Sequence, residues 1–306
     1  MKTKSWKLLA VCCLLAFIGS CSSGGGEDFP DSPAPNPPAS EKIRINLSCG
    51  VSSRVTDTTY EEGDKVGVYV VNYNGNVAGT LSQSGNHVNN LPFTYNSGKW
   101  DASSTIYWKD ATTHADFYVY YPYATVTNVM AHSFSIKEDQ STVAAYKASE
   151  FLYGTAMNLT PTTNAVNITT YHSMSCAVIK LVAGDGFTDE DLAKANISLE
   201  LNGLKTGASI NLSNGEVSST GDAKAIIPLK DDEQYMAIVV PQTVSAENFI
   251  VVKIDGEAYT MPKKDFTFVG GKRHTFTVTV SKTSSGLNVN IGAWEEDDVD
   301  NGGTAE

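Results

Sequence analysis

From residue 42 onward, short runs of alternating apolar and polar residues are separated by turn residues. The clearest run is 274–280, in which apolar side chains recur at nearly every second position. Successive side chains of a strand point to opposite faces, so this run predicts a strand with one face in a core and one in solvent. The continuous apolar run 235–240 predicts a central strand of a sandwich.

Turn residues between such runs predict five hairpins. Asn-Gly and Asp-Gly adopt positive φ at little cost, as tight hairpin turns require. The predicted turns are at 74–75, 96–98, 214–215, 255–256 and 270–271. Helical signals are few. Thr188 is a suitable cap for a short helix that runs through Ala195, and a further turn or two is predicted at 142–147. The pattern predicts an all-β chain with antiparallel sheets.

The strand signals divide into two groups of similar length. A loop-like stretch at 161–165 and a short strand at 166–169 precede a new apolar run that begins at residue 171. We therefore predict two tandem β-sandwich domains, 42–170 and 171–296, followed by an acidic and polar tail, 297–306.

The first 41 residues have a different character. Three lysines precede the apolar run 8–18, which is too short to span a bilayer and is typical of a secretory signal. Cys21 follows Gly19 and Ser20 in an arrangement that resembles a bacterial lipobox. This predicts a signal peptide at 1–20, cleavage between Ser20 and Cys21, and a lipid anchor (diacylglycerol, palmitate) on Cys21. An ordinary signal peptide with an incidental cysteine is the alternative.

Composition changes this picture in two ways. Residues 21–41 are rich in Gly, Pro and Ser and predict an extended tether. The formal net charge of the chain is −12, which argues against nucleic acid as a partner and against electrostatic binding to anionic lipid. A membrane attachment would therefore be covalent.

The sequence contains little that suggests catalysis. Its five histidines lack metal-ligand spacing, and no Gly-x-Ser-x-Gly elbow or phosphate-binding loop accompanies them. We therefore predict no catalytic residue, no metal, no cofactor and no enzymatic activity. Cys49 and Cys176 could form a disulfide or remain buried thiols, and both possibilities stay open.

Several motifs, in order along the chain, resemble one family. They are RVTD (54–57), YEEGDKVGVY (60–69), IYW (106–108), DFYVYYP (116–122), HSMSCAVIKL (172–181), GKRHTF (271–276) and VNIGAW (289–294). Together they resemble the fimbrillins, the subunits of type V pili of Gram-negative gut and oral anaerobes, and the resemblance covers residues 42 to about 296. The resemblance implies two tandem transthyretin-like β-sandwiches.

The resemblance also implies a route of assembly. Such subunits are exported as lipoproteins to the surface of the outer membrane, where a trypsin-like protease cuts after Arg or Lys and removes the first strand. A strand from the next subunit then fills the groove. Arg54 is the candidate cut site, and the alternating Ile43, Ile45 and Leu47 mark the removable strand. Arg44 is a weaker candidate. Alternatively Arg54 is an ordinary surface residue, and an uncut chain serves as a lipid-anchored accessory.

The alternating Leu287, Val289 and Ile291 form the candidate donor strand; the alternative is a final strand of the chain's own second domain. The acidic residues that follow favour a tip, anchor or accessory role. The implied partners are other fimbrial subunits, in a homo- or hetero-polymer, the outer membrane through the lipid, and a host or bacterial receptor or glycan in adhesion. An alternative function is a surface glycan-binding accessory lipoprotein, suggested by the tyrosine cluster 118–123.

Overall fold

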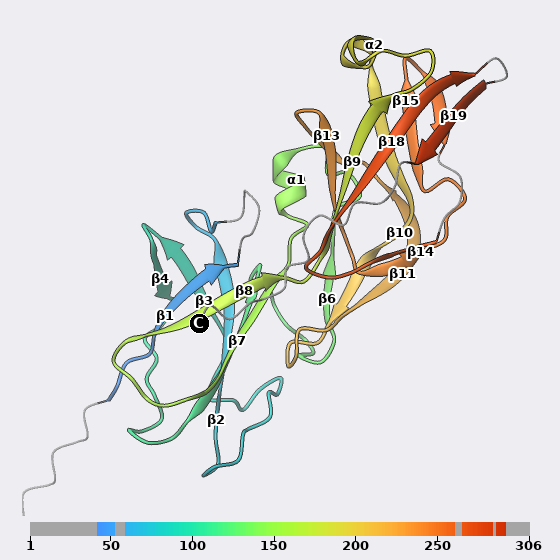
Figure 1. Ribbon diagram of the computed structural model, residues 1–306. Helices are drawn as coiled ribbons and strands as arrows, with labels where there is room; N and C mark the ends of the chain where they lie inside the picture. Colours follow the sequence, from blue (N-terminus) through green and yellow to red (C-terminus); the bar gives the residue numbers. More distant parts are fainter. Residues whose placement is uncertain (1–41, 53–58, 261–264, 284–285, 292–306) are drawn as a thin grey trace, which may run out of the picture. The chain divides into compact units, whose positions relative to one another are not determined.

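The computed structural model of the protein describes residues 42–52, 59–260, 265–283 and 286–291, and the regular secondary structure of this part of the chain is almost entirely β. The first sheet contains seven strands, in the order β1 (Asn46–Val51), β8 (Ala165–His172), β7 (Leu152–Leu159), β5 (Ala115–Tyr121), β2 (Lys65–Asn72), β3 (Val88–Asn96) and β4 (Lys99–Ala102). Figure 1 shows β1 beside β8.

The other described strands form two five-stranded sheets and one two-stranded sheet. One five-stranded sheet has the order β11 (Val217–Ile226), β10 (Ile197–Ile210), β15 (Ile250–Ile254) and β16 (Glu257–Thr260), with β6 (His132–Ser135) also paired to β10. The other has the order β12 (Leu229–Asp231), β13 (Gln234–Val239), β9 (Ser175–Ala183), β18 (Arg273–Thr283) and β19 (Gly286–Ile291). Strands β14 (Gln242–Val244) and β17 (Phe266–Phe268) pair with each other. The described helices are α1 (Val143–Lys147) and α2 (Asp189–Lys194).

Two hydrophobic cores lie against these sheets. The first is built from residues between Ile45 and Ile168, and the second extends to Val280. Neighbouring positions of β2 contribute to different cores, because Val68 packs in the first and Tyr69 in the second. Strand alternation thus explains why VYVV (68–71) in β2 and FYVY (117–120) in β5 are apolar at consecutive positions.

The predicted helices and three of the five predicted hairpins are confirmed. Thr188 caps α2 in a capping box with Asp191, and Thr142 caps α1. The turns at 96–98, 214–215 and 255–256 join β3 to β4, β10 to β11, and β15 to β16.

The other two predicted hairpins are wrong. After the turn at 74–75 only an isolated bridge between Asn74 and Val77 forms, because both edges of β2 are already occupied by β3 and β5. The strands on either side of 270–271 both exist but do not pair. Strand β18 lies between β9 and β19, and β17 pairs with β14 instead.

The all-β prediction is confirmed, with one feature that turn residues do not reveal. Strand β1 is parallel to β8, and β18 is parallel to β9. Parallel partners need long connections and carry no turn signal between them. Strand β6, before the predicted boundary at 170/171, pairs with β10, beyond it. The boundary itself stays a prediction.

Close approach of β7 and β8 gives a test of this arrangement. A Cβ added at the buried Gly154 would lie 2.3 Å from the carbonyl oxygen of Thr169, whereas one added at Gly50 in β1 would meet nothing within 4 Å. We expect Gly154→Ala to lower the free energy of unfolding by about 1–3 kcal/mol. The control Gly50→Ala should change it by less than about 1 kcal/mol. Urea unfolding measures both, and equal effects would contradict the close approach.

Candidate functional site

The segment 43–51 lies at the end of the seven-stranded sheet and inserts one row of side chains into the first core. Ile45, Leu47 and Cys49 are buried, with 3%, 6% and 9% of their surface exposed. The residues between them point outward and are exposed. Ile43 is half-buried and packs against the same core. The predicted alternation of this strand is therefore present.

Backbone hydrogen bonds hold this segment on both sides. On one side β1 pairs with β8 in parallel register, from Asn46 opposite Ala165 to Val51 opposite Thr170. On the other, the amide of Ile45 donates to the carbonyl of Ile106 (3.0 Å), and the amide of Trp108 donates to the carbonyl of Ile43 (2.9 Å). Residues 43–51 thus occupy a groove between β8 and the 106–108 segment.

Side chains close the groove at the C-terminal half of β1. The indole Nε1 of Trp100 in β4 donates to the carbonyl of Cys49 (3.1 Å). The hydroxyl of Thr170 donates to the carbonyl of Gly50 (3.1 Å) and therefore accepts from the hydroxyl of Tyr60 (2.8 Å). The ring of Tyr60 meets that of Trp100 edge to face, with centroids 4.7 Å apart. Sequence patterns did not reveal Trp100, Tyr60 or Thr170, because their contacts join residues far apart in the chain.

The groove holds a strand of the same chain. Each buried aliphatic side chain contributes about 1.5–3 kcal/mol by leaving water. The carbonyls and amides of β8 supply directional pairing along the segment. A cavity of about 710 Å³ lies at its C-terminal end and includes Ser52 and Thr59 in its lining.

Several predicted site residues lie outside the described part of the chain, namely Ser20, Cys21 and Arg54. The backbone of Leu287, Val289 and Ile291 belongs to β19, which pairs with β18 of the same chain. Their side chains lie outside what the structure describes. The lipid anchor, the cut site and the donor strand therefore remain predictions.

The two cysteines of the body are both free thiols. Cys49 points into the first core from β1, whereas Cys176 of β9 lies next to the second core, with its sulfur 3.5 Å from the hydroxyl of Tyr146. Burial raises the pKa of Cys49 to about 12 and that of Cys176 to about 11. Both thiols are therefore protonated at neutral pH.

The described residues offer little for catalysis. His114 and Asp116 do not pair: the imidazole Nδ1 contacts Oδ1 of Asn158 (2.7 Å), and a carboxylate oxygen of Asp116 accepts from the amide of Asn158 (2.6 Å). Within the described ranges no three His, Cys, Asp or Glu side chains gather as metal ligands. No helix in that same part has the length and apolar character to cross a membrane.

Comparison with known proteins identifies the family. A model of fimbrillin-like proteins matches residues 53–294. The chain belongs to the fimbrillin-like family. Over 308 residues it is 26% identical to the Putative fimbrium subunit Fim1C of Bacteroides uniformis, covering 94% of this chain and 95% of that protein.

Solved structures show that this fimbrillin-like chain shares an all-β fold with two proteins of Bacteroides. A putative cell adhesion protein of Bacteroides ovatus superposes with a TM-score of 0.63 at 17% identity, covering 86% of this chain and 100% of that one. One of Bacteroides uniformis gives a TM-score of 0.59 at 23% identity, covering 83% and 97%. The match to the family model begins just after β1 ends at Val51.

The burial of Cys49 predicts how this fimbrillin-like protein reacts with an alkylating agent. Only the thiolate reacts, so in the native protein the rate at Cys49 should rise about tenfold per pH unit from pH 8 until about pH 12. In denaturant the rate should level off above its ordinary pKa of about 8.5. At pH 8 we expect native Cys49 to react at least about a hundredfold more slowly than denatured Cys49.

Mass spectrometry of the Cys49 peptide after iodoacetamide labelling measures both rates. Equal rates in the native and denatured protein would show that residues 43–51 do not occupy the groove.

Proposed function

We propose that this chain is a non-enzymatic subunit of a cell-surface fimbrium, and that it assembles when a strand of another subunit replaces residues 43–51. The observation that carries the proposal is the position of this segment: it forms the edge strand of its sheet, yet Ile45 and Leu47 are buried in the core. Membership of the fimbrillin-like family and similarity to a Putative fimbrium subunit support it.

The place of the segment in the chain makes it removable. It precedes every other described strand, so a cut between residues 52 and 59 would release it without interrupting another strand. Arg54 is the Arg or Lys within that interval. Release would leave the backbone groups of β8 unpaired along one edge and uncover the apolar pockets of Ile45 and Leu47. An open edge of this kind is a template for another strand.

The candidate donor strand matches the vacated positions in spacing. Leu287, Val289 and Ile291 recur at every second residue, as do Ile45, Leu47 and Cys49. Both β1 and β19 contain six residues. A donor strand of this pattern can place three side chains on the core face and restore the pairing with β8.

Lipidation at Cys21 would keep the subunit at the membrane until it is cut. The chain would be exported as a lipoprotein and held at the outer membrane by its acyl chains, with residues 21–41 as a tether. A cut at Arg54 would separate the anchor, the tether and the first strand from the subunit in one step. Without that cut, the chain would remain a lipid-anchored base or accessory subunit.

Substitution of Arg54 tests the proposal. We expect wild-type protein recovered from fimbriae to begin at Val55. Arg54→Ala should retain Cys21 and be absent from polymers, since its groove stays filled. Arg44→Ala is the matched control and should behave as wild type. N-terminal sequencing of surface material and SDS-resistant ladders measure the two outcomes. An intact N-terminal segment in assembled wild-type subunits would overturn strand replacement.

A further inference from the structure

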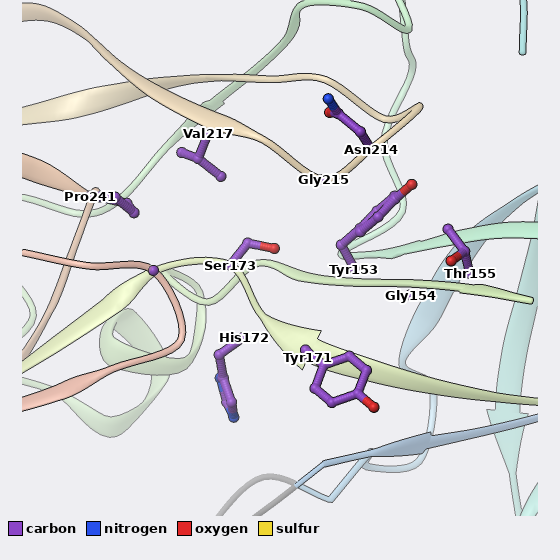
Figure 2. Close-up of a pocket in the computed structure, with 11 residues that line it drawn as sticks. Tyr153, Gly154, Thr155, Tyr171, His172, Ser173, Asn214, Gly215, Val217 and Pro241 are labelled. Atoms are coloured by element: carbon purple, nitrogen blue, oxygen red, sulfur yellow. The ribbon is translucent and has the colours of Figure 1, made fainter. Parts of the chain in front are cut away.

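A second cavity, of about 450 Å³, lies where β7 and β8 meet the turn between β10 and β11 (Figure 2). Its volume falls within the range of roughly 300–1,000 Å³ that is usual for small-molecule sites. Strand replacement would pair with β8 as far as Thr170, whereas the cavity is lined by the residues that follow, Tyr171 to Ser173.

One wall of this cavity is held rigid. The hydroxyl of Tyr153 donates to the carbonyl of Leu212 (2.9 Å). Gly215 lies against the same ring: its φ is +78°, and an added Cβ would fall 2.5 Å from Cδ1 of Tyr153. Only glycine fits both this backbone conformation and this contact. The ring is therefore fixed without a ligand, which lowers the entropic cost of binding.

A second aromatic residue, Tyr171, also lines the cavity and is open to solvent. Tyr171 of β8 is the register partner of Tyr153 in β7, and half of its surface (50%) is exposed. Val217 and Pro241 complete the apolar lining. An exposed tyrosine next to a fixed one offers aromatic surface to which a ring with C–H faces can pack.

The polar groups of the cavity are neutral. Oδ1 of Asn214 accepts from the amide of Glu216 (3.0 Å), and this contact orients the side chain so that Nδ2 remains as a donor. The hydroxyl-bearing residues Thr155 and Ser173 also line the cavity. Figure 2 places Asn214 above Tyr153, at the same end of the cavity.

The histidine among the lining residues points elsewhere. His172 is among the lining residues, but its Nδ1 is 2.9 Å from a carboxylate oxygen of Glu150. Figure 2 shows its ring directed away from Ser173. No Asp, Glu, Lys or Arg lines the cavity within the described ranges.

We propose that this cavity binds a neutral saccharide. A purely apolar ligand would bury Asn214, Thr155 and Ser173 without partners, which costs free energy. An anionic or cationic ligand would find no counter-charge. A pyranose ring has apolar C–H faces that can pack on Tyr171. The hydroxyls at its rim can form hydrogen bonds with the amide of Asn214 and the hydroxyls of Thr155 and Ser173, so the ligand matches both the apolar and the polar lining.

The experiment uses the full chain. A glycan array with neutral, sialylated and sulfated oligosaccharides selects a neutral probe, and calorimetric titration then gives its Kd. We expect Tyr171→Ala to weaken binding at least tenfold and Tyr171→Phe to keep it, because the aromatic face makes the contact. Asn214→Asp retains the acceptor for the Glu216 amide and removes the Nδ2 donor, so it should also weaken binding at least tenfold.

Tyr123→Ala is the matched control, since Tyr123 is exposed (36%) and lies outside the cavity. Thermal unfolding of each variant confirms that it folds, and polymer formation by Tyr171→Ala should equal that of wild type. Failure of the array to yield a neutral glycan, a preference for anionic glycans, or unchanged Kd values in both Tyr171→Ala and Asn214→Asp would overturn the proposal. None of these outcomes bears on assembly at the β1 groove.

Discussion

The seating of residues 43–51 against the first core is the interaction on which the rest of the account depends. This segment completes the seven-stranded sheet, covers the core with Ile45 and Leu47, and accepts the side-chain hydrogen bonds of Trp100 and Thr170. It is joined to the rest of the described structure by non-covalent contacts and by one connection, at its C-terminal end. A strand with these properties can be exchanged for another of the same pattern, and the remaining sheets can stay folded.

Strand β1 forms a parallel pair with β8 at the edge of the sheet. Because parallel neighbours are not joined by a hairpin, release of β1 would break no tight turn. The aromatic residues Tyr60 and Trp100 line its C-terminal half and would remain as a hydrophobic pocket for a replacement strand.

The proposed saccharide cavity at Tyr153 and Tyr171 is built on β7 and β8. The first sheet therefore carries both proposed sites, one for a strand and one for a neutral ligand.

Alternation in the sequence predicted most strands and the buried face of β1, because local burial imposes a period of two. The prediction of which strands pair was wrong where the true partners are distant in sequence. Strands β17 and β18 flank Gly270 and Gly271, yet each pairs with another strand. The contacts of Trp100 and Thr170 with β1 depend on the parallel register, which no local pattern encodes. Within the tyrosine cluster, Tyr118 and Tyr120 are buried, whereas Tyr123 is exposed. The proposed saccharide cavity is lined by two other tyrosines, Tyr153 and Tyr171.

The most direct test of the central claim is a density map of assembled filaments, read at the strand position next to β8. The account predicts residues of a neighbouring subunit in this position, with side chains of the Leu287, Val289 and Ile291 pattern where Ile45, Leu47 and Cys49 lie in the single chain. Density that continues from residue 52 of the same subunit into its own Asn46–Val51 would contradict it.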